Sequence, residues 1–368
     1  GGTSARPFFR KIAFPTGAGP VRYMQTTQHE AENSTSAAFA LMEDGDVYSW
    51  GDNGFGHLGH GDNTNRLTPT RMIAFDQNVR MISGGGRCMG ALTIDHKIFM
   101  WGENNQGQIG NGGTTDVYTP TEISIGGDCA KLKVSGQSAS THCHAIRADG
   151  KLYGWGGNAY GQIGDNSTTN RTTPTLISTL GQSTGFEVID IWGMGGEWGF
   201  NYALTDNGNV YSWGHNTVGN LGLGDNVNKL VPTLNNNITW PSQCIGMGKS
   251  TSASYLYQRT AIMSHANLAD RIARQNGVVL TCGLAGEPLG RPHSGNQNVP
   301  APVGIAPPMQ GKLQWLTVSG YHTSSTNSNF CMVLDEEGIM HMWGFGANYS
   351  TGRIYNGSDT TPWQPMIL

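Results

Sequence analysis

The chain has 368 residues and a formal net charge of −4, and only 13% of its residues are charged, roughly half the usual share. No Lys/Arg cluster stands out, which argues against nucleic-acid binding through a broad basic surface, and no apolar run reaches the roughly 18 residues of a membrane span. Glycine is abundant at 54 residues, while ten tryptophans and 37% apolar residues indicate a folded core. This composition favours many short strands joined by tight turns.

Residues 1–20 are predicted to form an N-terminal arm or a closing strand. The segment "PFFRKIAF" (7–14) resembles the later segment "PTRMIAF" (69–75). It could start an incomplete blade, form a loose arm, or close a ring with strands from the other terminus. Exposed Phe8 and Phe9 would anchor such an arm to a partner, whereas an edge strand would bury them.

From residue 21 onward the chain repeats, which predicts one repeat-built domain. Trp-Gly recurs at 50–51, 101–102, 155–156, 213–214 and 343–344, and Cys282-Gly283 replaces it in one degenerate unit. A Leu or Ile lies nine residues before each Trp, and a Pro lies nineteen residues after it. The six units span about 21–75, 76–126, 127–180, 181–240, 241–307 and 308–368. The repeated pairs are predicted to build the core, namely Trp50, Trp101, Trp155, Trp213, Trp343, Gly51, Gly102, Gly156, Gly214 and Gly344.

Each unit is predicted to contain four short strands. The first resembles "VRMIS", the second is the "ALT" strand before an Asp-Gly turn, and the third is "VYSWG". A Gly-rich loop then leads to a fourth strand that begins at its Pro. Such units predict an all-β fold, a single β-propeller of four-stranded antiparallel blades. Six blades are favoured over seven, with the ring closed by terminal strands.

Two segments, "YGWGGNAYGQIGDNSTTNRTTPTLI" (153–177) and "FMWGENNQGQIGNGGTTDVYTPTEI" (99–123), resemble the regulator of chromosome condensation repeat family. The resemblance covers about residues 21–368 and implies a β-propeller, normally of seven blades. It also implies several possible functions: guanine nucleotide exchange on small GTPases, inhibition of an enzyme by a secreted propeller, or a module of virus particles and surface proteins. Only "GYHT" (320–323) approaches the family's Gly-x-x-His-Thr element, so no exchange residues are assigned.

Candidates for chemistry are few. A Ser-His-Asp arrangement cannot be read from the sequence, and no helix is expected after the glycine-rich segments, so no catalytic residue and no cofactor is predicted. His142 and His144 would share one face of a strand but lack a third metal ligand. His57 and His60 are expected to be exposed in a loop. The segments "GDNTN" (61–65) and "GDNVN" (224–228) are expected to be Asp-capped turns rather than calcium sites.

The six cysteines form no CxxC pair. Buried free thiols are the first interpretation, and a disulfide framework is the alternative.

Partner binding is predicted where the units differ. The longest unit carries an insertion (249–277) with Tyr255, Tyr257 and Arg259, whose alternative role is to complete a strand pair. Trp198 and Phe200 lie near a turn. We therefore expect a non-enzymatic protein-binding or structural module of a virion, phage particle or extracellular surface assembly. The alternatives are an exchange factor or a secreted inhibitor, and a cytoplasmic or nuclear location stays open.

Overall fold

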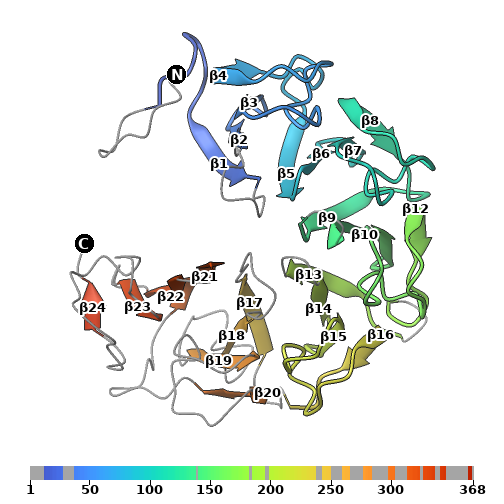
Figure 1. The fold of residues 1–368 in the computed structure, drawn as a ribbon, viewed down its shortest axis with the longest axis vertical. Coiled ribbons are helices and arrows are strands. Elements are labelled where there is room, and N and C mark those ends of the chain that lie inside the picture. The colour runs from blue at the N-terminus through green and yellow to red at the C-terminus, as the bar shows by residue number, and fades with distance from the viewer. Residues whose placement is uncertain are drawn as a thin grey trace. The chain divides into compact units, whose positions relative to one another are not determined.

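A computed structural model describes residues 12–27, 37–137, 140–181, 185–194 and 199–237, and beyond these only strand segments. The described residues form six four-stranded antiparallel sheets and no α-helix, which confirms the all-β, propeller-type fold (Figure 1). No helix of the described chain is long and apolar enough to span a membrane. Closure of a ring stays a prediction.

The strands of the first three sheets are β1 (Val21–Thr26), β2 (Ala37–Met42), β3 (Val47–Gly51), β4 (Arg66–Arg71), β5 (Val79–Gly85), β6 (Cys88–Thr93), β7 (Ile98–Gly102), β8 (Val117–Ile123), β9 (Cys129–Ser135), β10 (His142–Arg147), β11 (Leu152–Gly156) and β12 (Arg171–Leu176). The strands of the other three are β13 (Val188–Met194), β14 (Phe200–Thr205), β15 (Val210–Gly214), β16 (Lys229–Leu234), β17 (Gln243–Lys249), β18 (Arg259–His265), β19 (Gly277–Gly283), β20 (Gln297–Pro302), β21 (Leu313–Thr323), β22 (Thr326–Asp335), β23 (Met340–Gly344) and β24 (Gln364–Met366).

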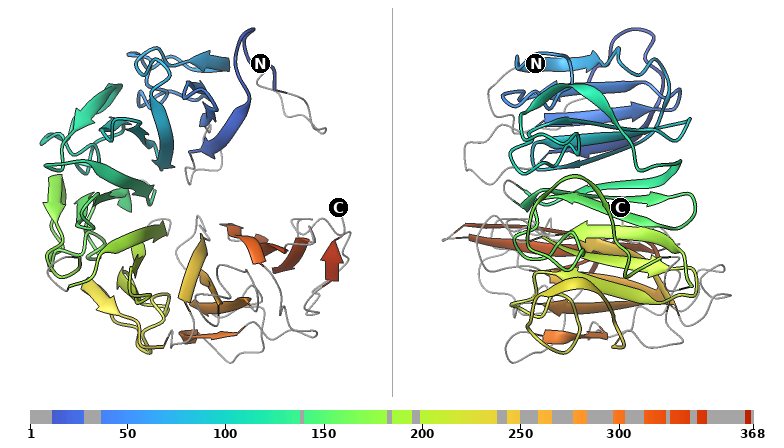
Figure 2. Two further views of the ribbon diagram at one scale, coloured as in Figure 1. Left: turned by 180° about the vertical axis from the view of Figure 1, so that it is seen from behind. Right: turned by 90° about the vertical axis from the view of Figure 1, so that its right-hand side faces the viewer.

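Every sheet takes its four strands in sequence order from one continuous segment. The chain divides into two compact units, one of residues 1–159 and 167–187, the other of 160–166 and 188–368. In the first unit the first strands of the three sheets, β1, β5 and β9, lie next to one another. The fourth strands, β4, β8 and β12, form the opposite edge of each sheet (Figure 2). Residues 12–20 contain no strand, and the predicted strand residues before them lie outside the described part.

The fourth strand begins earlier than its Pro predicts. Pro69 lies inside β4, and the pairing of β3 with β4 shifts register between Ser49 and Gly51. A proline has no N–H to donate, and β4 is an edge strand, so the missing donor is tolerated at this irregularity. The expectation that the strand starts at Pro69 is therefore corrected.

In the four sheets whose loop after the third strand is described, one buried asparagine holds that loop. In the second sheet the Asn104 Oδ1 atom accepts the Ile109 N–H at 2.9 Å. Its Nδ2 atom donates to the carbonyls of Gly113 and Thr115, at 3.1 and 3.0 Å. Its backbone N–H donates to the Asp116 carboxylate at 2.9 Å. The same backbone N–H bond, at 2.8 to 2.9 Å, recurs from Asn53 to Asn65, from Asn158 to Asn170 and from Asn216 to Asn228.

The turns at 61–65 and 224–228 are Asp-capped, as the sequence predicts. Asp62 Oδ1 accepts the Thr64 N–H at 2.9 Å, and Oδ2 pairs with Arg66 at 2.7 Å. Asp225 makes the equivalent ion pair with Lys229 at 2.6 Å. Their carboxylate oxygens are thus used within the turn.

The repeated tryptophans bond to the loop that precedes each of them in the chain. The indole N–H of Trp101 donates to the carbonyl of His57 in the preceding loop at 2.8 Å. Trp155 and Trp213 donate to the equivalent carbonyls of Gln108 and Gln162, both at 3.0 Å. All three indoles are fully buried, which confirms their structural role.

The close approach of these indoles explains a repeated glycine. Gly59 has a φ of +77°, and a Cβ there would lie 2.9 Å from Trp101 Nε1. Gly110 and Gly164 stand in the same relation to Trp155 and Trp213. Glycine is required at these places both by backbone conformation and by space.

Trp50 differs from the three buried repeat indoles because it is only half-buried. The ring of Phe14 meets Tyr48 and Trp50 edge-on, with centroids 5.6 and 5.8 Å away. The N-terminal segment therefore covers part of the first sheet. The side chain of Trp343, on β23, lies outside the described residues.

Replacing Asn104 tests whether its hydrogen bonds stabilise the loop. Asn104→Ala removes the bonds to Ile109, Gly113 and Thr115, and it leaves the buried Ile109 N–H without a partner. We expect a loss of about 3 kcal/mol in the free energy of unfolding, measured by urea denaturation with tryptophan fluorescence. Thr114→Ala, at an exposed site of the same loop, is the control and should change stability little. Equal stability of the two variants would contradict a framing role for Asn104.

Candidate interaction site

Only one of the side chains predicted to contact a partner is described in full. Phe200 is the first residue of β14, is fully buried, and packs against Tyr202 with ring centroids 6.2 Å apart. The expectation that it faces a partner is therefore corrected: it is a core residue. Arg259 begins β18, but its side chain lies outside the described residues. So do Phe8, Phe9, Trp198, Tyr255 and Tyr257.

The loops differ from one another at the second, fifth and seventh residues after the tryptophan. These residues are Asp52, Phe55 and His57, then Glu103, Gln106 and Gln108, then Gly157, Tyr160 and Gln162, then His215, Val218 and Asn220. At these three positions, carboxylates occur only in the first two of the four loops. We call Asp52, Phe55, His57, Arg87 and Glu103 the first-loop cluster.

Arg87 joins the cluster from the turn between β5 and β6. Its guanidinium carbon lies 4.0 Å from the centroid of the Phe55 ring, a cation–π contact. Both side chains are half-buried. Among the described residues no carboxylate lies within 4.0 Å of this guanidinium, so its N–H groups are available to another acceptor.

Glu103 is held beside Arg87 by the backbone, because its N–H donates to the Arg87 carbonyl at 3.0 Å. The side chain is buried, and Oε1 accepts from Asn105 at 3.0 Å. Oε2 is buried and has no hydrogen-bond partner in the described residues. Burial raises the pKa of the Glu103 carboxyl, an effect that the charge of Arg87 opposes.

His57 is buried, not exposed as the loop position suggests, with only 1% of its surface accessible. Its Nε2 atom lies 3.9 Å from the Asp52 carboxylate, and its Nδ1 atom is buried without a partner in the described part of the chain. Burial lowers the pKa of His57 to about 4, so the ring is neutral near pH 7. The expectation for His60 is also corrected: it is half-buried, with Nε2 3.0 Å from Ser49 Oγ.

The cluster is suited to binding a partner rather than to making or breaking covalent bonds. It offers a guanidinium stacked on an aromatic ring, a buried carboxyl oxygen and a neutral imidazole, all fixed by a rigid loop frame. Sequence reasoning missed it because its five residues come from two loops and a turn of two sheets. The one signal available was the variation between loops at positions flanked by invariant Asn and Gly.

His142 and His144 do lie on one face of β10, with ring centroids 5.5 Å apart. Both are buried in the sheet, and His142 Nδ1 lies 2.8 Å from the Ser140 carbonyl oxygen. No group of three or more His, Cys, Asp or Glu side chains able to hold a metal lies in the described ranges.

The burial of His57 predicts an acid-sensitive stability. Its folded pKa of about 4 lies below the ordinary value of 6.5, so the unfolded chain binds the proton more readily between these values. Stability is therefore lost as the pH falls through this window, by about 2 kcal/mol between pH 7 and pH 5. The glutamine of His57→Gln, the residue of the second and third loops, cannot take up that proton.

The measurement is urea unfolding of wild type and His57→Gln at pH 7 and pH 5. The wild type should lose about 2 kcal/mol more than the variant. Glu103 is present in both proteins, so its opposite dependence cancels in the difference. Parallel pH dependence of the two proteins would show that His57 is not the responsible group.

Known proteins resemble this chain in sequence. A model of the regulator of chromosome condensation (RCC1) repeat matches residues 44–92, 95–143, 149–193 and 207–249, which is about half of the chain. The ultraviolet-B receptor UVR8 of Arabidopsis thaliana is 34% identical over 200 residues, 54% of this chain and 43% of the receptor. The human E3 ubiquitin-protein ligase HERC2 is 32% identical over 192 residues, 52% of this chain and 4% of the ligase. The chain thus spans less than half of either relative.

Solved structures agree on the fold. Yeast RCC1 (Prp20), in its complex with Kap60, has a TM-score of 0.64 at 18% identity, covering 89% of this chain and 72% of that chain. Human WBSCR16 has a TM-score of 0.57 at 20% identity, covering 77% and 67%. At such identities the likeness concerns the fold alone. Taken with the repeated Trp-Gly and Asn frame, these matches place the chain in the regulator of chromosome condensation (RCC1) repeat family.

Proposed function

We propose that this chain is a non-enzymatic protein-binding module that uses the loop side of its blades, with the first-loop cluster as a contact point. The observation that carries the proposal is Arg87, stacked on Phe55 and without a carboxylate partner in the described residues. Arginine and aromatic side chains held rigidly at a half-buried site are the type of group that dominates binding energy at protein interfaces. The loop frame supports them, because the same asparagine bonds to the loop backbone recur from loop to loop while the side chains between them vary.

Relatives with this fold support a role in protein binding. Yeast Prp20 is seen bound to Kap60, and its binding to Gsp1p and histones has been described. At 18% and 19% identity these partners are not transferred to this chain. Their common feature is that a propeller serves as a platform for another protein.

The proposed setting is a virion, phage particle or extracellular surface assembly. Its support is composition: few charged residues, a polar share made up largely of Asn, Ser and Thr, and abundant Gly. Fractionation of the source tests the setting, because a structural module should be recovered with particles or surface fractions at constant stoichiometry. Recovery only as a soluble monomer would contradict it.

Arg87→Ala tests the contact point. Immobilised wild type and variant are incubated with the particle or surface fraction of the source, and bound proteins are quantified by mass spectrometry. We expect the variant to retain at least about tenfold less of the partner, because a central arginine is worth more than about 1 kcal/mol. Lys97→Ala, an exposed cation elsewhere in the same sheet, is the matched control. Equal retention by both variants would remove Arg87 from the interface.

The alternative, a guanine nucleotide exchange factor, is favoured only by the likeness to Prp20. Release of labelled guanine nucleotide from a panel of small GTPases decides between the two. We expect the release rate to be unchanged by a stoichiometric amount of the chain. Acceleration of release from any member of the panel would favour the exchange factor.

A further inference from the structure

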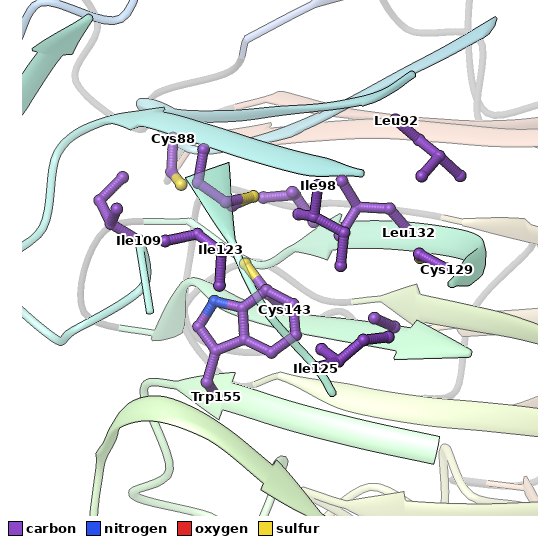
Figure 3. Packing of buried hydrophobic residues seen from close by; sticks show 13 residues of the cluster. Cys88, Leu92, Ile98, Ile109, Ile123, Ile125, Cys129, Leu132, Cys143 and Trp155 are labelled. Carbon is purple, nitrogen blue, oxygen red and sulfur yellow. The ribbon is translucent and has the colours of Figure 1, made fainter. Parts of the chain in front are cut away.

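Two cysteines from neighbouring sheets of the first unit meet in the core. Cys88 is the first residue of β6 and Cys143 lies in β10. Both are fully buried in the cluster that Trp155 and Ile109 also line (Figure 3). Both are free thiols, as is Cys129 nearby.

The two thiols converge on one acceptor. Cys143 Sγ lies 3.3 Å and Cys88 Sγ lies 3.9 Å from the carbonyl oxygen of Gln108. The same oxygen accepts the indole N–H of Trp155 at 3.0 Å. The thiols also interact with each other, and this contact adds to the burial that raises the pKa of Cys143.

A hydrogen bond to this carbonyl does not require two thiols. At the equivalent place in the next pair of sheets, Asn201 Nδ2 donates to the Gln162 carbonyl at 2.8 Å, and Trp213 supplies the indole. Asn201 pairs with Trp213 as Cys143 pairs with Trp155, so Cys143 takes the place of that amide. Cys88 is a second side chain at the Gln108 carbonyl, where one would be enough. The need to satisfy this carbonyl therefore does not explain why Cys88 lies beside Cys143.

We propose that Cys88 and Cys143 are an oxidisable pair that forms a disulfide linking the second sheet to the third. The oxidant is a small disulfide such as oxidised glutathione. The Cys143 thiolate attacks it and releases one glutathione thiolate. The Cys88 thiolate then attacks the Cys143 sulfur of the mixed disulfide and releases the second. The two protons of the cysteine thiols pass to the two glutathione thiolates, so two cysteines are oxidised and one small disulfide is reduced.

Oxidation replaces one arrangement of the core by another. The sulfurs must approach to about 2 Å, which removes their contacts with Gln108 and leaves its carbonyl to Trp155. Burial raises the pKa of Cys143 and shields both thiols from the oxidant, so the reaction belongs to folding or to transient separation of the two sheets. The bond would close the segment 88–143 into a loop and restrict the unfolded chain.

The experiment uses the full chain, unfolded under reducing conditions and refolded with either reduced or oxidised glutathione. Free thiols are then alkylated in denaturant, and peptides are mapped by mass spectrometry without reduction. We expect a linked peptide pair containing Cys88 and Cys143 after oxidative refolding. The thermal midpoint should rise by about 5 °C over the reduced protein.

Three variants make the assignment specific. Cys129→Ser removes the neighbouring thiol, whose Sγ lies 3.2 Å from the Lys131 carbonyl, and it should keep both the link and the shift. Cys88→Ala and Cys143→Ala should each lose both. If a variant fails to refold, the peptide map of the wild type still decides. Recovery of Cys88 and Cys143 as alkylated residues in oxidatively refolded wild type would overturn the proposal, as would a link from either one to Cys129.

Discussion

The bond from each buried indole N–H to a carbonyl of the preceding loop is the interaction on which the packing of neighbouring sheets depends. It requires the loop carbonyl to point at the next sheet and the loop backbone to lie against an aromatic ring. The buried asparagine supplies the first condition, since it fixes the turn through its amide. A glycine such as Gly110, with a φ of +85°, supplies the second. Trp, Asn and Gly therefore repeat together.

The loops thus contain two kinds of position: residues that the fold requires, and residues between them that can vary. The Trp, Asn and Gly residues of the frame are the same in the four described loops. The residues between them carry the differences, including the half-buried Phe55 and the buried Glu103. A buried carboxyl and a buried neutral imidazole both cost stability unless they are paired. Their retention beside Arg87 is consistent with a use in recognition rather than in folding.

The Gln108 carbonyl shows how the same frame can acquire a second property. In two described interfaces a tryptophan shares this carbonyl position with a side chain from the second strand, an amide in one and a thiol in the other. The exchange preserves the hydrogen bond but introduces redox chemistry, because a thiol can be oxidised and an amide cannot. A second cysteine on the adjacent sheet completes the pair.

The sequence by itself determined the repeat, the four strands of each unit, the Asp-Gly turns and the structural role of the Trp, Gly and Asn positions. These follow from local rules of turn conformation and from regular spacing. It did not reveal that Phe200 and His57 are buried, that Pro69 lies inside a strand, or that Cys88 and Cys143 meet. Only the tertiary structure decided these points, because packed sheets are covered on both faces. Every residue of β6 and β14 is buried, so alternation along a strand no longer separates core from surface. Contacts between sheets join residues that no local pattern relates.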